Sequence, residues 1–304
     1  MTYLNRLITF CLLTAGFFLL GNSALAQAAP VPPSQRIVSL APSVTETLFA
    51  LGFGDRVVGV TTYCDYPAEA RKVPKIGGFM NPSLETIAAK RPDFVIGVTS
   101  ATDAVKAREM ERLGLKVTLI SLGSVNEILR SIKSIARLLG NSDAGEKLVA
   151  KITRQFDEIK TRVASAPRRA TLLTVGLRPL VVVGGKNFIN ELIYLAGGEN
   201  IAGNADQPWL NLPNEYVVAK APQVIIEAGM GSERGKSAKH WDDLKSIPAV
   251  REHRVYAYQS DKILRPGPRI GEGLEEIARL VHPECFAEAK NAGHKGSGCE
   301  GTRP

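Results

Sequence analysis

One segment of this chain occurs twice, and this repeat constrains the fold more than any other feature. Residues 79–96 recur in step and without a gap at residues 209–226. Each copy has an aromatic ring, an asparagine two residues later, a glutamate six residues later, then Ala-Lys-x-Pro and an apolar run. The copies lie too far apart for a solenoid repeat. The repeat therefore predicts two similar lobes with a ligand cleft between them.

The N-terminus predicts export. Residues 1–28 read as a signal peptide, with Arg6 before an apolar run and small-x-small cleavage sites at Ala24-Leu25-Ala26 and Ala26-Gln27-Ala28. A retained membrane anchor is the alternative, but the apolar run is shorter than the ~20 residues that a spanning helix needs. We expect an exported, soluble mature chain.

Charge and motifs exclude several classes of function. The net charge is +8, but the basic residues are spread among acids, so we expect no nucleic-acid partner. The chain has no Walker spacing, GxSxG, HExxH or GxGxxG after a strand, and its four histidines suggest no shared metal and predict solvated surface. We therefore expect no enzyme activity and no resident cofactor or metal.

Three cysteines follow the signal segment: Cys64, Cys285 and Cys299. Export permits a disulfide. Cys285 and Cys299 are the pair closest in sequence, which would leave Cys64 free, although spacing alone does not establish the pairing.

The first lobe is predicted over residues 36–140. Short apolar runs at 36–40, 56–60, 94–98 and 116–120 indicate buried parallel strands that alternate with helices. Two capping-box patterns, Ser43-x-x-Glu46 and Ser124-x-x-Glu127, predict helix starts.

A single long helix is predicted next, within a linking segment at 141–166. One apolar stripe marks it: Leu148, Ile152, Phe156, Ile159 and Val163. At ~1.5 Å per residue it would run roughly 35 Å, enough to cross from lobe to lobe, although a surface helix within one domain has the same periodicity.

The second lobe is predicted over 168–283, before a flexible tail at 284–304. Its predicted strands are 171–175, 180–183, 224–227 and 254–258. Its predicted helices are 188–195 and 270–281. The predicted fold class is α/β: two Rossmann-like lobes with parallel sheets joined by one long helix.

The repeat also places one acid at the start of a helix in each lobe. Ser83 and Asn214 are expected N-caps, so Glu85 and Glu215 fall in first helical turns. Such acids can simply favour the helix dipole. Alternatively, the two matched acids dock onto basic residues of a partner that is itself a dimer.

Aromatic and polar loops supply candidate ligand contacts. Phe79, Met80 and Trp209 are expected on loops near strand ends, where open α/β sheets bind ligands. A third loop holds Tyr63, Asp65 and Tyr66, and a polar loop holds Ser260, Asp261 and Arg265. The rings suit a planar or amphipathic ligand, and the polar loop suits an anionic group. Rings that cover core edges and a solvated turn are the alternatives.

The chain resembles the substrate-binding proteins of ABC importers for iron complexes and cobalamin, whose lobes are joined by one long helix. The stretches that carry the resemblance are Ile37–Glu46, Val58–Pro67, Leu84–Asp93, Gly197–Ile201, Pro208–Glu215 and Pro268–Ile270. They span nearly all of the mature chain.

The resemblance implies a monomeric periplasmic protein that captures a cobalamin-type corrinoid. A ferric siderophore or haem is the alternative ligand. Tyr63, Phe79 and Trp209 would surround the ligand, with Ser260, Asp261 and Arg265 nearby. Glu85 and Glu215 would meet arginines of the importer's permease dimer. An exported enzyme and a sensor without a transporter remain rival classes.

Three positions depart from the cobalamin-binding members of this family. Val98 and Phe79 stand where those members have tryptophans, and Ala196 replaces a cysteine, so their disulfide is not reproduced. These changes leave the lobe plan intact and leave the ligand open.

Overall fold

Two β-sheets joined by one long helix organise the chain. The computed structural model describes residues 35–99, 101–229, 240–259 and 261–287. The predicted signal peptide, the tail beyond 287, Ser260 and Cys299 lie outside these ranges. The lobe boundaries stay a prediction.

The first sheet has four parallel strands in the order β2-β1-β3-β4. They are β1 (Ile37–Ser39), β2 (Val57–Val60), β3 (Phe94–Val98) and β4 (Val117–Ile120), and β1 is buried throughout. The helices of this lobe are α2 (Pro42–Ala50), α3 (Leu84–Ala89), α4 (Ala101–Arg112) and α5 (Val125–Leu138). This lobe matches the predicted parallel α/β plan.

The second sheet is mixed rather than wholly parallel as predicted. Its order is β10-β9-β5-β6-β8, with β7 paired to β5. These strands are β5 (Arg169–Leu177), β6 (Leu180–Val183), β7 (Gly198–Asn200), β8 (Trp209–Asn211), β9 (Val224–Glu227) and β10 (Val255–Ala257). β6 runs antiparallel to β5 and β8. Two residues join β5 to β6, and so short a connection allows only a hairpin.

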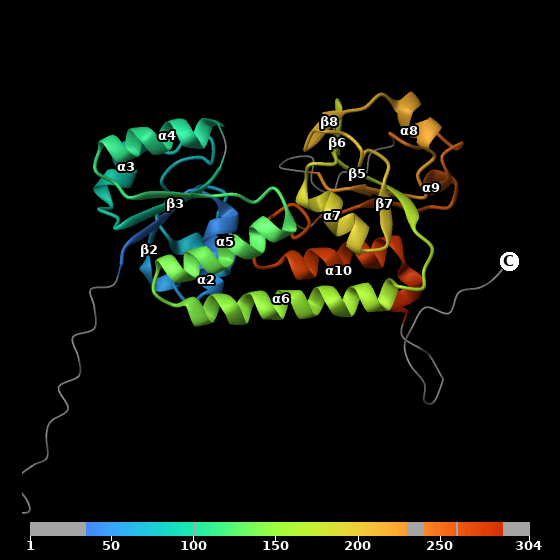
Figure 1. Ribbon diagram of the computed structural model, residues 1–304. Coiled ribbons are helices and arrows are strands. Elements are labelled where there is room, and N and C mark those ends of the chain that lie inside the picture. The colour runs from blue at the N-terminus through green and yellow to red at the C-terminus, as the bar shows by residue number, and fades with distance from the viewer. Residues whose placement is uncertain (1–34, 100, 230–239, 260, 288–304) are drawn as a thin grey trace, which may run out of the picture. The chain divides into compact units, whose positions relative to one another are not determined.

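The long helix is α6 (Ser142–Val163), which spans 22 residues. It begins at Asn141, whose side chain accepts a hydrogen bond from the Ala144 N–H. Its buried face includes Ile152, Phe156 and Val163. α6 packs against α5 of the first lobe and against α10 (Ile270–Val281) of the second (Figure 1). The predicted lobe-to-lobe helix is therefore confirmed.

The remaining helices of the second lobe are α7 (Phe188–Leu195), α8 (Asn214–Lys220) and α9 (Pro248–Arg251). Short 3₁₀ turns occur at Gly54–Arg56, Ala68–Lys72 and Pro283–Phe286. Within the described ranges, every helix is too short or too polar to cross a lipid bilayer.

The repeat corresponds to the same helix–strand unit in each lobe. α3 leads to β3, and α8 leads to β9. At equivalent places after these helices, Arg91 has φ 45° and Ala221 has φ 46°. Non-glycine residues seldom adopt this left-handed conformation. Its occurrence at both matched positions shows that the duplication extends to the backbone.

The caps of the two repeat helices differ. Ser83 caps α3 by accepting from the Thr86 N–H, as predicted. Asn214 is not the cap of α8, because Pro213 holds that position without a side-chain bond. The Asn214 side chain instead contacts His240 at 3.1 Å.

Candidate functional site

A cluster of ion pairs connects the two lobes. Its centre is Glu46, from α2 of the first lobe, whose side chain is 1% exposed. Its carboxylate accepts from Arg265 Nη1 at 2.9 Å, from Arg269 Nε at 2.7 Å and from Arg269 Nη2 at 2.7 Å. Both arginines belong to the segment that leads into α10, so one buried acid holds two basic groups of the other lobe.

Two aspartates complete this cluster. Asp261 pairs with Arg265 Nε at 2.7 Å and with Arg269 Nη2 at 3.2 Å, and Asp65 pairs with Arg265 Nη2 at 2.7 Å. Burial alone lowers the pKa of the Arg269 guanidinium, but the hydrogen bond and charge of Glu46, aided by Asp261, raise it above its ordinary value. Arg269 therefore stays charged. We call these five residues the inter-lobe cluster.

The position of Glu46 corrects the first capping-box prediction. α2 begins at Pro42 after the N-cap Ala41, which makes no side-chain cap, and Ser43 lies buried inside the helix. Glu46 is directed at the arginines instead of at its own helix start. Gly267 lies close to Ser43: a Cβ on this glycine would come 3.4 Å from the Ser43 carbonyl oxygen.

The Tyr63–Tyr66 loop is held on both sides. Between the tyrosines, the buried Cys64 contacts the Thr45 and Thr61 hydroxyls at 3.0 and 3.1 Å. From the second lobe, Arg265 Nη2 donates to the Tyr63 carbonyl at 3.4 Å, and the Arg269 guanidinium lies 3.9 Å from the centre of the Tyr66 ring.

Both tyrosines of this loop remain available to a ligand. Tyr63 is 64% exposed and Tyr66 is 45% exposed. The structure thus brings together five of the predicted ligand residues: Tyr63, Asp65, Tyr66, Asp261 and Arg265.

The remaining predicted ligand residues are not joined to this cluster. Met80 is 56% exposed, whereas Phe79 is half-buried and packs against the main core. Trp209 is 37% exposed and lies in the edge strand β8 rather than in a loop as predicted. Among the described residues, no hydrogen bond, ion pair or ring contact links these three side chains to the inter-lobe cluster. Their role as ligand contacts stays a prediction.

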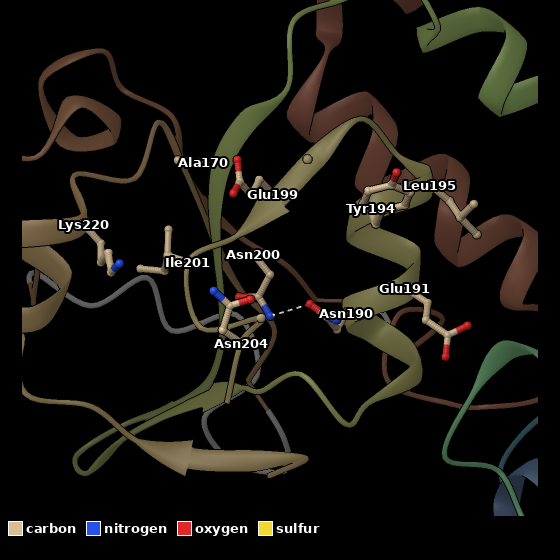
Figure 2. Close-up of a pocket in the computed structure, with 12 residues that line it drawn as sticks. Ala170, Asn190, Glu191, Tyr194, Leu195, Glu199, Asn200, Ile201, Asn204 and Lys220 are labelled. Atoms are coloured by element: carbon tan, nitrogen blue, oxygen red, sulfur yellow. Dashed lines mark hydrogen bonds between the residues drawn. The ribbon is translucent and has the colours of Figure 1, made fainter. Parts of the chain in front are cut away.

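A separate cavity of about 550 Å³ lies in the second lobe. It is lined by parts of α7, β7 and the end of α8, and Asn190 and Asn200 meet across it through a hydrogen bond of 3.0 Å (Figure 2). None of the predicted ligand residues lines this cavity. We therefore base the candidate site on the Tyr63–Tyr66 loop, where the exposed rings and the charges are.

Residues 37–262 match the periplasmic binding protein family. The chain belongs to this family. An uncharacterized ABC transporter substrate-binding lipoprotein of Bacillus subtilis, YvrC, is 33% identical over 84% of this chain and 82% of its own length. A vitamin B12-binding protein of Vibrio campbellii is 27% identical over 81% and 88%. The periplasmic heme-binding protein RhuT from Roseiflexus sp. RS-1 superposes with a TM-score of 0.71 at 27% identity, covering 83% of this chain and 99% of its own.

In this periplasmic binding protein, Glu85 and Glu215 lie in the first turns of α3 and α8, and both are exposed. The repeat therefore presents one exposed acid per lobe at equivalent places. Their docking role stays a prediction.

A second contact between the lobes, made by Glu191, was not predicted from the sequence. Glu191 of α7 accepts from the Val125 N–H at the start of α5, at 3.3 Å. Burial, with the nearby charge of Glu127, raises the pKa of the Glu191 carboxyl. Glu127 itself completes the predicted capping box with Ser124, which is confirmed. Sequence gives no signal for a pairing between helices of different lobes.

The histidine prediction is wrong at one position. His282 is fully buried, and its ring nitrogens contact the Gly197 carbonyl at 3.2 Å and Glu284 at 3.1 Å. Ligand atoms of His282, Glu284 and Cys285 lie within 4.8 Å of one another. Cys285 is disulfide-bonded, so it offers no thiolate to a metal.

Of the two described cysteines, Cys64 has a free thiol, as expected. The predicted partner of Cys285, Cys299, lies outside the described residues. The pairing of these two cysteines therefore stays a prediction.

Proposed function

We propose that this protein captures a cobalamin-type corrinoid in the periplasm and delivers it to an ABC importer. The observation that carries the proposal is a pair of exposed tyrosines, Tyr63 and Tyr66, on a loop fastened between two lobes. Flat rings of this kind stack on a large planar ligand. The 27% identity with a vitamin B12-binding protein over most of both chains supports this ligand.

In this proposal the ligand lies against the tyrosine loop. Phe79, Met80 and Trp209 contribute further apolar contact, and Asp65, Ser260 and Asp261 contribute polar contact. The protein performs no chemistry on the ligand and needs no resident cofactor. It acts as a monomer, and its signal peptide is removed during export.

Titration calorimetry with cyanocobalamin at micromolar protein concentration tests the ligand. We expect a single site, and we expect Tyr63→Ala and Tyr66→Ala each to weaken binding. Tyr194→Ala is the matched control, because Tyr194 is 61% exposed but lies beside the other cavity. Absence of corrinoid binding, together with tight binding of haem or a ferric siderophore, would reject the corrinoid.

Haem or a ferric siderophore is the second candidate ligand. The similarity to a heme-binding protein favours it. The resemblance to cobalamin binders also implies tryptophans where Val98 and Phe79 stand here, which would leave less ring area for a corrin. The absorption spectrum and mass of the molecule that co-purifies from the native host distinguish corrin, haem and ferric chelates.

We further propose that Glu85 and Glu215 dock onto the permease dimer of the importer. Their exposure and their matched places in the repeat support this role. The double variant Glu85→Ala/Glu215→Ala should keep its ligand affinity but lose ligand uptake in a host that lacks its own copy. The control is Glu111→Ala/Glu158→Ala, which removes two exposed acids outside the repeat. Lost ligand affinity in the first variant would place the acids in the pocket instead.

A further inference from the structure

The carboxylates of the inter-lobe cluster already pair with both of its arginines. Each of the three guanidinium nitrogens of Arg265 faces a different carboxylate, those of Glu46, Asp65 and Asp261, at 2.7–2.9 Å. Arg269 uses Nε and Nη2 for Glu46 and Asp261, and the face of its guanidinium covers Tyr66. A ligand carboxylate could pair with Arg265 only by displacing one of these acids.

Burial also keeps the arginines away from a ligand. The side chain of Arg265 is 14% exposed and that of Arg269 is 9% exposed, whereas Tyr63 is 64% exposed and Tyr66, with Arg269 over one ring face, is 45% exposed. The cluster has three acids for two arginines, so it adds no net positive charge to the site. Two other cations touch the loop: Arg71 donates to the Asp65 carbonyl, and Lys75 donates to the Cys64 and Ala70 carbonyls.

Resting on the proposed function, we propose that Arg265 and Arg269 are positioning residues rather than ligand clamps. Glu46 holds both arginines, and the arginines contact the Tyr63–Tyr66 loop of the first lobe. They therefore fasten this loop to the second lobe. Because carboxylates already neutralise them, these two arginines do not attract a ligand carboxylate, and the site suits a ligand whose periphery is uncharged, such as the amides of a corrinoid. This inference replaces the sequence-based expectation that Arg265 binds an anionic group.

Amide hydrogen exchange on the ligand-free protein tests the positioning role. At short labelling times, we expect exchange in residues 61–70 to become roughly tenfold faster in Glu46→Gln, because the loop opens locally. Amides of β1 and β3 exchange through global unfolding, so they stay protected on this time scale although the variant is less stable. Asp65→Asn, which removes one partially exposed partner, should show a smaller increase of the same kind. Glu275→Gln, which breaks an exposed pair within α10, is the control. Unchanged loop exchange in both cluster variants would overturn the positioning role, whatever the ligand.

Paired ligands test the charge selection. One pair is cyanocobalamin and a derivative with one peripheral amide hydrolysed to a carboxylate, and the other is haemin and its dimethyl ester. Glu46→Gln removes one negative charge, so we expect it to shift the affinity ratio toward the carboxylate form by about 2- to 30-fold, the effect of one charge roughly 8 Å away at an effective dielectric constant between ~20 and ~80. Glu275→Gln should leave the ratio as in the wild type.

Two results separate this inference from the proposed function. If the carboxylate form binds more tightly and Arg265→Gln removes that preference, Arg265 is a clamp and the inference is wrong. If neither corrinoid nor haem binds, the proposed function is wrong, and the exchange experiment alone decides the positioning role.

Discussion

Replacing Glu46 by glutamine should strongly destabilise the ligand-free protein. The Glu46 oxygens accept three hydrogen bonds from two arginines, and the side chain is almost fully buried. Glutamine keeps one oxygen and puts an amide N–H₂ where the other stood, so buried donors face donors and both arginines lose their ion pair with Glu46, although Asp65 and Asp261 remain. Breaking a buried pair in this way costs about 3 kcal/mol or more.

For a chain of this size, each kilocalorie per mole lowers the melting temperature by ~2–4 °C, so we expect a fall of roughly 6–12 °C. Thermal unfolding followed by circular dichroism at pH 7 measures it, without ligand, because bound ligand would add its own stabilisation. Glu275→Gln is the control: its pair with Arg279 is about half exposed and should contribute less than ~1 kcal/mol. Equal melting temperatures for both variants would refute the idea that the inter-lobe cluster contributes to stability.

Four further substitutions have defined expectations, each measured by equilibrium unfolding in urea. Ser124→Ala removes the capping-box hydroxyl of α5 and should cost about 1 kcal/mol; no loss would contradict its capping role. Arg91→Gly and Ala221→Gly should each be neutral or stabilising by up to ~1 kcal/mol, because glycine relieves the left-handed backbone; clear destabilisation would contradict this. Burial raises the pKa of Glu191, so its contribution to stability is present below the unfolded pKa and is lost as pH rises through the folded pKa. Glu191→Gln should therefore gain stability over the wild type at pH 7 and lose that gain toward pH 4; a gain independent of pH would contradict it.

Local patterns were enough to predict most of the fold. The stripe on α6 and the apolar runs of the first sheet depend on neighbours in sequence, and the structure contains them nearly as predicted. The short strands β7 and β8 were not predicted, because their sequences, Gly-Glu-Asn and Trp-Leu-Asn, lack the apolar run that marks the equally short β1. Because Trp209 belongs to β8, it does not lie in the loop that was predicted for it.

The candidate site was only partly readable because its contacts are long-range. Ser43-x-x-Glu46 and Ser124-x-x-Glu127 look alike in sequence, yet only the second forms a capping box. What distinguishes them is an arginine 219 residues away, which captures Glu46 across the lobes. Sequence identified the polar loop that holds Arg265 but could not say that acids of the protein itself occupy it.

The buried thiol between the two exposed tyrosines offers a native reporter. Cys64 is 1% exposed and reduced, and threonine hydroxyls enclose it. A maleimide can reach this sulfur only when the surrounding segment opens. The rate of alkylation therefore reports how often the segment opens. The alkylation rate would rank ligands, the permease and substitutions by how much each slows or speeds the opening of this segment. No label needs to be engineered into the protein.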